Sequence, residues 1–225
     1  MAPFGASRAG LMSTRVDAIP DSGANHRWDM DADPVPDQIG SLDLTLNGPS
    51  VEDDNRISLD GVDDDGTIND PLTDLVTGGN DGGGVGVWFR VDNLSDLMAL
   101  WSNSDLAGDS RFLFAVRPES DGGLTFFDNS DRRESGWEPE NTTTWYFGVV
   151  RWDPSDNGEL LIDGDIKHTE GFDFGSNTNT DDLGISNFRD DMYFEGEIGI
   201  SWIWLEEPSD SQLADAFDST KGIYK

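Results

Sequence analysis

Hydrophobic and polar residues alternate along most of the chain from Trp28 onward, which is the pattern expected of half-buried β-strands. The alternation is clearest over residues 42–46 and 85–91. Further short apolar segments follow, separated by clusters of Gly, Asn and Asp that are typical of turns. They predict strands at residues 57–59, 97–101, 111–117, 124–127, 145–152, 160–162, 183–186 and 198–205.

Two of these segments, 145–150 and 198–205, are apolar on both alternations, which predicts central strands that are covered on both faces or packed near a corner of the sandwich. One helix is predicted near the end of the chain. Residues 208–211 offer an N-cap there, and Leu213, Ala214 and Phe217 share one face. We expect this helix to close one edge or end of the structure. Many short strands with almost no helix predict an all-β sandwich or jelly roll.

The first 25 residues are small and rich in Gly, Ser and Ala, with one short possible helix over residues 7–12. We therefore expect an N-terminal arm over 1–25, followed by a single domain over 26–225. The arm could be a disordered terminus or a docking strap. The strap is suggested by two arginines and three larger apolar residues, which are Arg8, Arg15, Phe4, Leu11 and Met12. The arm shows no apolar run typical of a signal peptide, which suits a protein that is assembled inside the cell.

Acidic residues greatly outnumber basic ones, with 46 Asp and Glu against 14 Lys and Arg, for a formal net charge of -32. The charge is spread over the whole chain. Disorder is not indicated, because 35% of the residues are hydrophobic and 8 Trp and 12 Phe are present. At molar salt the screening length falls to about 3 Å, so the composition predicts a halophilic protein. The same charge repels phosphate backbones and anionic lipids, so we expect neither nucleic-acid binding nor membrane insertion.

Several sequence pieces occur in the order found in one superfamily. They are Trp-Asp-Met-Asp at 28–31, an apolar-Asp-Gly-x-Asp-Asp element at 57–64, Val-Trp-Phe-Arg at 87–90, Trp-Tyr at 145–146, Ile-Asp-Gly at 162–164 and Phe-Glu-Gly-Glu-Ile at 194–198. Over residues 28–217 the chain resembles the laminin G-like, concanavalin A-like lectin/glucanase superfamily. The resemblance implies a concanavalin A-like jelly-roll sandwich of two antiparallel sheets with one short C-terminal helix. Such domains serve carbohydrate recognition, adhesion or spacing, and the fold alone does not decide among them.

Catalytic chemistry has little support in the sequence. The hydrolases of the superfamily carry Glu-x-Asp-x-x-Glu or a close variant, and this string is absent here. With no cysteine and two isolated histidines, His26 and His168, neither a thiolate site nor a nucleophilic triad is indicated. The glycine-rich stretch 78–84 lacks the Lys-Ser/Thr ending of a phosphate loop and reads as a flexible loop. We therefore expect no enzyme, and the nearest acidic approximations to the signature are Glu195, Glu197, Glu134, Glu138 and Glu140.

Calcium is the cofactor that the sequence favours, because hard cations take carboxylate and carbonyl oxygens from acidic loops. The best local cluster is Asp60, Asp63, Asp64 and Asp65. The cluster does not match an EF-hand loop, and general acidic hydration is the alternative. Many relatives in the superfamily carry an acid just after the position of Ile198, where this chain has Gly199.

A ligand site is predicted in the loop 128–144, which carries Arg132, Arg133 and Trp137 between two strands. Sugar rings stack on exposed aromatic side chains, and arginine binds carboxylates in a bidentate manner. In the alternative interpretation Trp137 folds back onto the sandwich and the arginines offset nearby acidic groups.

The leading functional hypothesis is a non-enzymatic structural or surface-binding module. It would be a capsid decoration, turret or tail/fibre component on the virion surface of a haloarchaeal virus. Its expected partners are other virion or surface proteins, contacted through the arm, and further copies of itself in a closed oligomer. The second hypothesis is an extracellular or cell-surface adhesin or receptor-binding lectin that recognises host glycans. A glycoside hydrolase is the third and has the least support.

Overall fold

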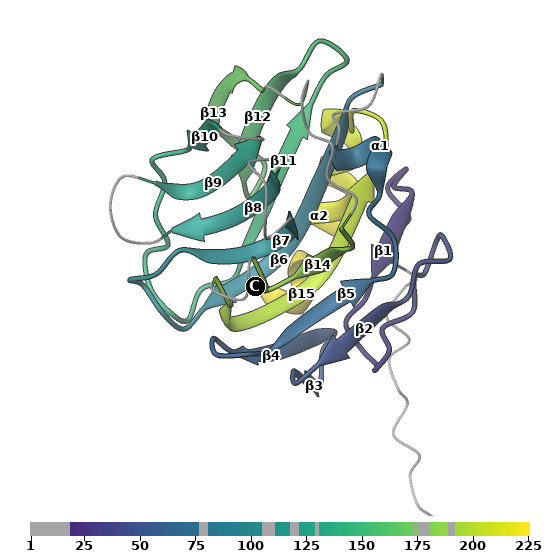
Figure 1. The fold of residues 1–225 in the computed structure, drawn as a ribbon, viewed down its shortest axis with the longest axis vertical. Coiled ribbons are helices and arrows are strands. Elements are labelled where there is room, and N and C mark those ends of the chain that lie inside the picture. The colour runs from purple at the N-terminus through teal and green to yellow at the C-terminus, as the bar shows by residue number, and fades with distance from the viewer. Residues whose placement is uncertain are drawn as a thin grey trace, which may run out of the picture.

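The computed structural model describes residues 19–76, 81–104, 111–117, 122–128, 131–172, 174, 181–188 and 192–225. Two antiparallel sheets pack face to face, and a long helix lies on the outer side of one of them (Figure 1). The all-β sandwich predicted from the sequence is therefore confirmed. No helix in these ranges has the length and apolar character needed to cross a bilayer.

The larger sheet contains eight strands. β1 pairs with β15 at residues 201–203, whereas β4 pairs with β15 at residues 195–198. The long central strands come from the segments that are apolar on both alternations. In spatial order the strands are β13 (Asp165–Gly171), β12 (Asn157–Ile162), β11 (Tyr146–Trp152), β6 (Gly83–Val91), β15 (Glu195–Trp204), β4 (Arg56–Asp60) and β3 (Ser50–Glu52), with β1 (His26–Trp28) beside β15.

The smaller sheet contains seven strands and faces the larger one across the core. Its spatial order is β10 (Asp131–Glu134), β9 (Gly123–Asp128), β8 (Arg111–Arg117), β7 (Met98–Ser104), β14 (Leu183–Ile185), β5 (Asp65–Ile68) and β2 (Leu44–Asn47). Consecutive strands cross from one sheet to the other, for example from β4 to β5 through the turn at residues 61–64.

Large aromatic side chains fill the space between the sheets. Trp28 of the larger sheet and Trp101 of the smaller one lie with ring centroids 5.2 Å apart and planes inclined by 40°. Further along the core, Phe126 stacks on Trp152 at 6.1 Å and Phe112 meets Phe126 edge-on at 5.1 Å. Because these rings interdigitate from both sheets, they fix the spacing of the sandwich.

The outer face of the larger sheet carries a second aromatic cluster, which helix α2 (Asp210–Tyr224) covers (Figure 1). Trp88, Phe147 and Trp202 point to this side, and Trp88 Nε1 donates to the buried hydroxyl of Thr220 at 2.7 Å. The prediction that these strands are covered on both faces is therefore confirmed. The alternating residues of β6, β11 and β15 supply one apolar face to each side of the sheet.

Helix α2 begins where the sequence predicts, but its buried face and its position differ from the prediction. Ser209 is the N-cap: its hydroxyl accepts from the Gln212 amide, and the Gln212 side chain accepts from the Ser209 amide. Ala214, predicted to face the core, is exposed, and Ala216 is buried instead. The helix covers a sheet face rather than an edge, because removing the aromatic side chains of that face from water is favourable.

Several elements were not predicted. The short helix α1 (Thr73–Val76) and the strands β1, β3, β5, β10 and β13 add to the expected set, and the first predicted strand begins at Leu44 rather than residue 42. Gly83 and Gly84, expected in a flexible loop, are buried residues of β6, where Gly83 packs on Trp152.

The end of the predicted arm lies on the sandwich. Asn25 N donates to Ile203 O at 2.9 Å, and Trp204 Nε1 donates to Ser22 O at 3.1 Å. Ile19 packs against the aromatic cluster under α2, and its carbonyl accepts from Arg27. Residues 1–18, with the short helix predicted over 7–12, lie outside the described residues.

Candidate functional site

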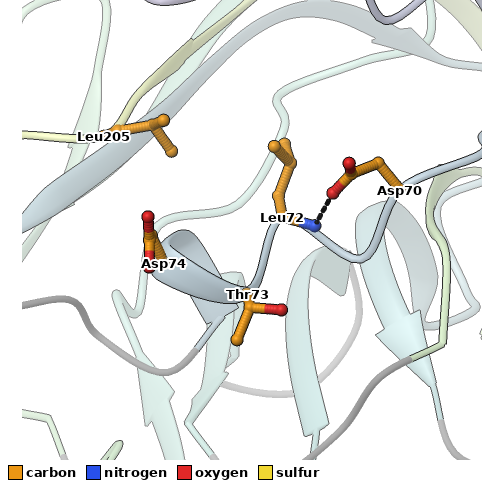
Figure 2. Close-up of a pocket in the computed structure, with 5 residues that line it drawn as sticks. All are labelled: Asp70, Leu72, Thr73, Asp74 and Leu205. Atoms are coloured by element: carbon orange, nitrogen blue, oxygen red, sulfur yellow. Dashed lines mark hydrogen bonds between the residues drawn. The ribbon is translucent and has the colours of Figure 1, made fainter.

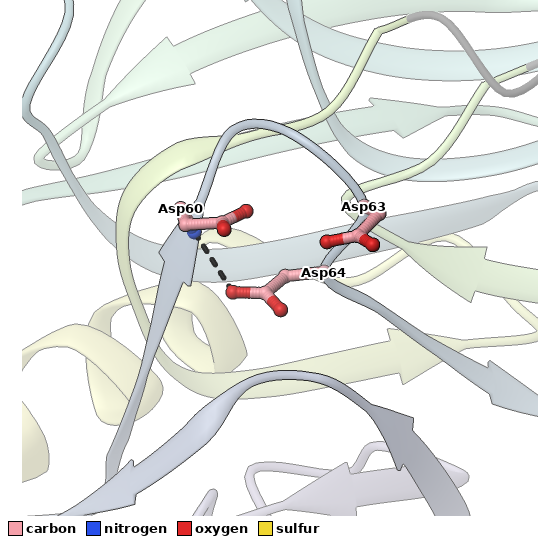
Figure 3. Close-up of side chains that lie close together, drawn as sticks. All are labelled: Asp60, Asp63 and Asp64. Atoms are coloured by element: carbon pink, nitrogen blue, oxygen red, sulfur yellow. Dashed lines mark hydrogen bonds between the residues drawn. The ribbon is translucent and has the colours of Figure 1, made fainter.

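The predicted metal ligands lie in the turn of residues 60–65, here called the Asp60 turn, which carries the chain from β4 to β5 (Figure 3). Carboxylate oxygens of Asp60, Asp63 and Asp64 all lie within 4.8 Å of one another. Asp60 N donates to Asp64 Oδ2 at 2.9 Å, which draws the buried Asp64 side chain back across the turn. Asp65 points elsewhere and accepts from Asn187 Nδ2 at 3.1 Å.

The Asp60 turn concentrates like charges in a partly desolvated place. Burial, followed by the charges of Asp60, Asp63 and Asp65, raises the pKa of Asp64, and the amide of Asp60 opposes that shift only in part. Three clustered carboxylates fit the hard-cation chemistry of calcium, which takes six to eight oxygens in all. Carbonyls or water would have to supply the rest, so calcium at this turn stays a prediction.

The predicted ligand residues of the 128–144 loop do not meet on one surface. Arg132 is 41% exposed and pairs with Glu134 at 2.9 Å. Arg133 follows on the other face of β10, where it lies 3.5 Å from buried Asp128 and 3.6 Å from Glu170 of β13. Because those two carboxylates belong to different sheets, Arg133 links the sheets at this open edge.

Trp137 turns inward rather than toward solvent. Its ring meets Tyr146 edge-on at 4.8 Å and Phe89 at 6.4 Å, and it packs against the main core. The backbone of Trp137 crosses so close to Gly123, which has φ +55°, that any Cβ there would collide with the Trp137 carbonyl. Trp137 is half-buried, so only part of its side chain is open to a sugar ring.

A groove of about 380 Å³ lies between α2 and the hairpin of β12 and β13. Leu161, Leu213 and Phe217 form its apolar floor, and Ile166 beside them is 52% exposed. Three carboxylates stand at the rim of this α2–hairpin groove, from Asp163, Asp165 and Asp210. The sequence did not reveal it, because it forms only when α2 packs beside the hairpin.

The rim carboxylates of the α2–hairpin groove are partly used. Each of the three has a cation nearby: Asp163 accepts from Lys225 Nζ at 2.5 Å, Asp165 lies 3.4 Å from Lys167 Nζ, and Asp210 lies 2.7 Å from Arg151. The side chain of Asp210 is nevertheless 89% exposed and that of Asp165 81% exposed. The groove therefore presents an apolar floor with accessible negative charge around it.

A smaller hollow of about 230 Å³ lies beside α1 (Figure 2). Asp70, Leu72, Thr73, Asp74 and Leu205 line it, and Asp70 Oδ1 accepts from Leu72 N at 2.8 Å. The hydrogen bond holds the chain entering α1. We assign this hollow no ligand.

Three of the five acidic residues nearest to a hydrolase signature are engaged with neighbours. Glu197 lies between two arginines, at 2.8 Å from Arg90 Nε and 3.5 Å from Arg56 Nε. Glu195 accepts from Asn93 Nδ2 at 2.9 Å. Of the other three, Glu134 is paired with Arg132, while Glu138 and Glu140 are exposed.

The turn of residues 37–42, here called the Asp37 turn, was missed from the sequence. The fully buried Asp37 carboxylate accepts from His26 Nδ1 at 2.7 Å. Burial alone would raise the pKa of Asp37, but the hydrogen bonds from His26 and the turn amides outweigh it and lower the pKa. The side chain of His26 is itself largely covered. The amides that donate are those of Arg27, Ile39, Gly40 and Leu42.

Solved structures share this fold. Domain 4 of AbnA, an extracellular GH43 arabinanase from Geobacillus stearothermophilus solved with arabinotriose, matches with a TM-score of 0.67 at 16% identity, over 88% of this chain and 98% of that one. The Trypanosoma rangeli sialidase matches with a TM-score of 0.69 at 13% identity, over 91% of this chain and 34% of that one. The receptor binding domain of a botulinum neurotoxin of C/D mosaic serotype matches with a TM-score of 0.65 at 13% identity, over 88% and 52%.

These likenesses show the β-sandwich jelly-roll fold that the family resemblance implies. The chain spans nearly the whole arabinanase domain, about half of the toxin domain and about a third of the sialidase. No family model matches the sequence, and no curated protein matches it.

Proposed function

We propose that this protein is a non-enzymatic structural or surface-binding module that works within an assembled surface at high salt. The assembly we favour is the virion of a haloarchaeal virus, with the protein as a capsid decoration, turret or tail component. The net charge of -32 supports a high-salt setting, because only a screening length of about 3 Å relieves such self-repulsion.

The proposal rests on which groups the fold pairs internally and which it leaves exposed: a hydrolase-like carboxylate is paired, whereas an apolar groove is open. Glu197 belongs to the pair, with Glu195, that comes near the hydrolase signature, and its carboxylate is held by Arg90 and Arg56. The α2–hairpin groove, in contrast, offers exposed apolar surface with a charged rim, which suits contact with another chain.

Mass by light scattering in about 3 M NaCl tests the assembly role. We expect the full chain to form a closed oligomer and to leave a broad panel of polysaccharides unhydrolysed. A monomer at every concentration would remove the support for assembly, and hydrolysis of any glycan would replace the proposal with an enzyme.

Glycan binding is the second candidate, favoured by the likeness in fold to a domain solved with arabinotriose. Arg132 is the exposed member of the predicted ligand set, and Trp137 is packed on Tyr146. Arg132→Ala is therefore the sharper variant for a glycan array, because Trp137→Ala also disturbs the core. Array binding that Arg132→Ala abolishes while the melting temperature is unchanged would establish this candidate.

A further inference from the structure

The α2–hairpin groove is an exposed apolar feature for which the sequence itself offers an occupant. Leu161 and Leu213 at its floor are almost fully covered by the fold, whereas Ile166 leaves half of its side chain in water. Exposed apolar surface beside a hollow marks a contact site when a complementary segment exists.

The rim of the groove defines the chemistry of that segment. Asp165 and Asp210 expose 81% and 89% of their side chains on the two walls. Asp163 adds a third carboxylate, which also holds Lys225. An occupant with an apolar centre and a cation on either side would therefore match the groove in both shape and charge.

Residues 8–15 of this chain have that pattern. Leu11 and Met12 stand between Arg8 and Arg15, with small or hydroxyl residues filling the remaining positions. Over residues 1–18 the side chains carry two arginines and the single acid Asp17, a net charge of +1 in a chain whose total is -32. Residues 1–18 precede the first described residue, Ile19.

The place where the described chain begins favours a neighbour's segment over the molecule's own. Ile19 is held by Arg27 of β1, on one flank of α2, and the groove lies against β12 on the other flank. β1 and β12 are four strand steps apart through β15, β6 and β11. At about 4.8 Å per step this is about 19 Å, before the chain climbs over a helix about 10 Å wide.

The seven residues from Met12 to Ile19 span at most about 25 Å when fully extended. The molecule's own Met12 would therefore reach its groove only with this segment almost fully extended. A second copy meets no such restriction.

We propose that Leu11 and Met12 of one copy insert into the α2–hairpin groove of another, with Arg8 and Arg15 against its rim carboxylates. This inference rests on the proposed assembly function and names the contact that would build the oligomer. At molar salt only direct charge contacts persist, so burial of the two apolar side chains supplies most of the affinity.

Engineered cysteines test the contact directly, because the chain has no cysteine of its own. In full-length Met12→Cys/Ala214→Cys, mild oxidation in about 3 M NaCl should give disulfide-linked dimers and larger ladders on a non-reducing gel. Met12→Cys/Val51→Cys is the matched control, because Val51 is also exposed but lies on β3 at the opposite edge of the same sheet.

Adding Leu11→Ser to the reactive pair should slow cross-linking about ten-fold, as expected for the loss of one buried leucine. Equal cross-linking in the control pair, or an intrachain disulfide, would overturn the inference. Light scattering of the unmodified chain separates the two proposals. An oligomer without the specific cross-link would contradict this contact alone. A monomer would contradict the assembly function as well.

Discussion

The Asp37 turn and the Asp60 turn show two opposite ways of placing carboxylates in an acidic protein. The side chain of Asp37 is fully buried, and four backbone amides and His26 donate hydrogen bonds to its carboxylate. Asp64 is also buried but has other carboxylates as its neighbours, and one amide hydrogen bond partly offsets them. Their pKa values accordingly move apart, downward for Asp37 and upward for Asp64.

The difference shows that local acid density is a poor guide to what an acidic residue does. Asp37, which has no carboxylate cluster around it, organises a loop through its hydrogen bonds. In the Asp60 turn the clustered carboxylates repel one another, and a bound cation or proton would relieve that repulsion. Four experiments test this difference between the two turns.

Asp37→Ala should be the most damaging change, because it leaves four amides and His26 without their acceptor in a covered place. We expect a loss of about 3–5 kcal/mol in the free energy of unfolding. Urea denaturation in about 3 M NaCl would measure it. Asp63→Ala is the matched control and should cost little, so a similar loss in both variants would erase the distinction between the turns.

Dilution of the salt should weaken the Asp60 turn more than the Asp37 turn. Between about 3 M and 0.1 M NaCl we expect the melting temperature to fall by about 5–10 °C, because screening of the net charge is lost. The double variant Asp60→Asn/Asp63→Asn should lose less on dilution than the parent chain. An identical fall in both would mean that the repulsion is not concentrated at this turn.

Calcium should act at the Asp60 turn alone. If the turn binds calcium in the submillimolar range, about 10 mM CaCl₂ should add about 1–2 kcal/mol of stability to the parent chain. Asp63→Asn should lose that gain, while magnesium at the same concentration controls for screening. A shift that persists in Asp63→Asn would show that calcium acts as a general counterion.

The pH dependence should run in opposite directions at the two turns. The lowered pKa of Asp37 gives stability that is present above the ordinary value of 3.8 and is lost as the pH falls through the folded-state pKa. The raised pKa of Asp64 costs stability at neutral pH; this cost begins to decrease as the pH falls through that pKa, which lies above 3.8, and is gone below 3.8.

Asp64→Asn should therefore raise the stability slightly at neutral pH and flatten the melting profile above the ordinary carboxyl value of 3.8. Thermal melts across about pH 3 to 7 would follow both effects. A profile unchanged by Asp64→Asn would contradict the raised pKa.

The sequence predicted those parts of the fold that depend on local pattern. β6 follows from apolar alternation and β11 from a continuous apolar run, and the start of α2 follows from residues that cap it through adjacent backbone groups. The buried side of α2 was wrong at Ala214, because both alanines fit a helix and only the aromatic surface beneath selects Ala216.

The candidate site could be predicted only in part, because its contacts join distant residues. The acid cluster of the Asp60 turn is contiguous in sequence, so Asp60, Asp63 and Asp64 could be found. Asp37 contacts mainly backbone amides, which leave no side-chain signature, although His26 eleven residues earlier is its one sequence trace. The α2–hairpin groove combines residues some fifty positions apart and had no sequence signal.

The tryptophan pair in the core also provides a spectroscopic signal that reports whether the two sheets are packed together. Trp28 belongs to the larger sheet and Trp101 to the smaller, and their rings lie 5.2 Å apart and inclined by 40°. Two indoles so near and so tilted share their electronic excitation, which splits their circular-dichroism band into a positive and a negative lobe. The couplet exists only while the two layers are docked, so it would distinguish a closed sandwich from separated sheets that keep their strands.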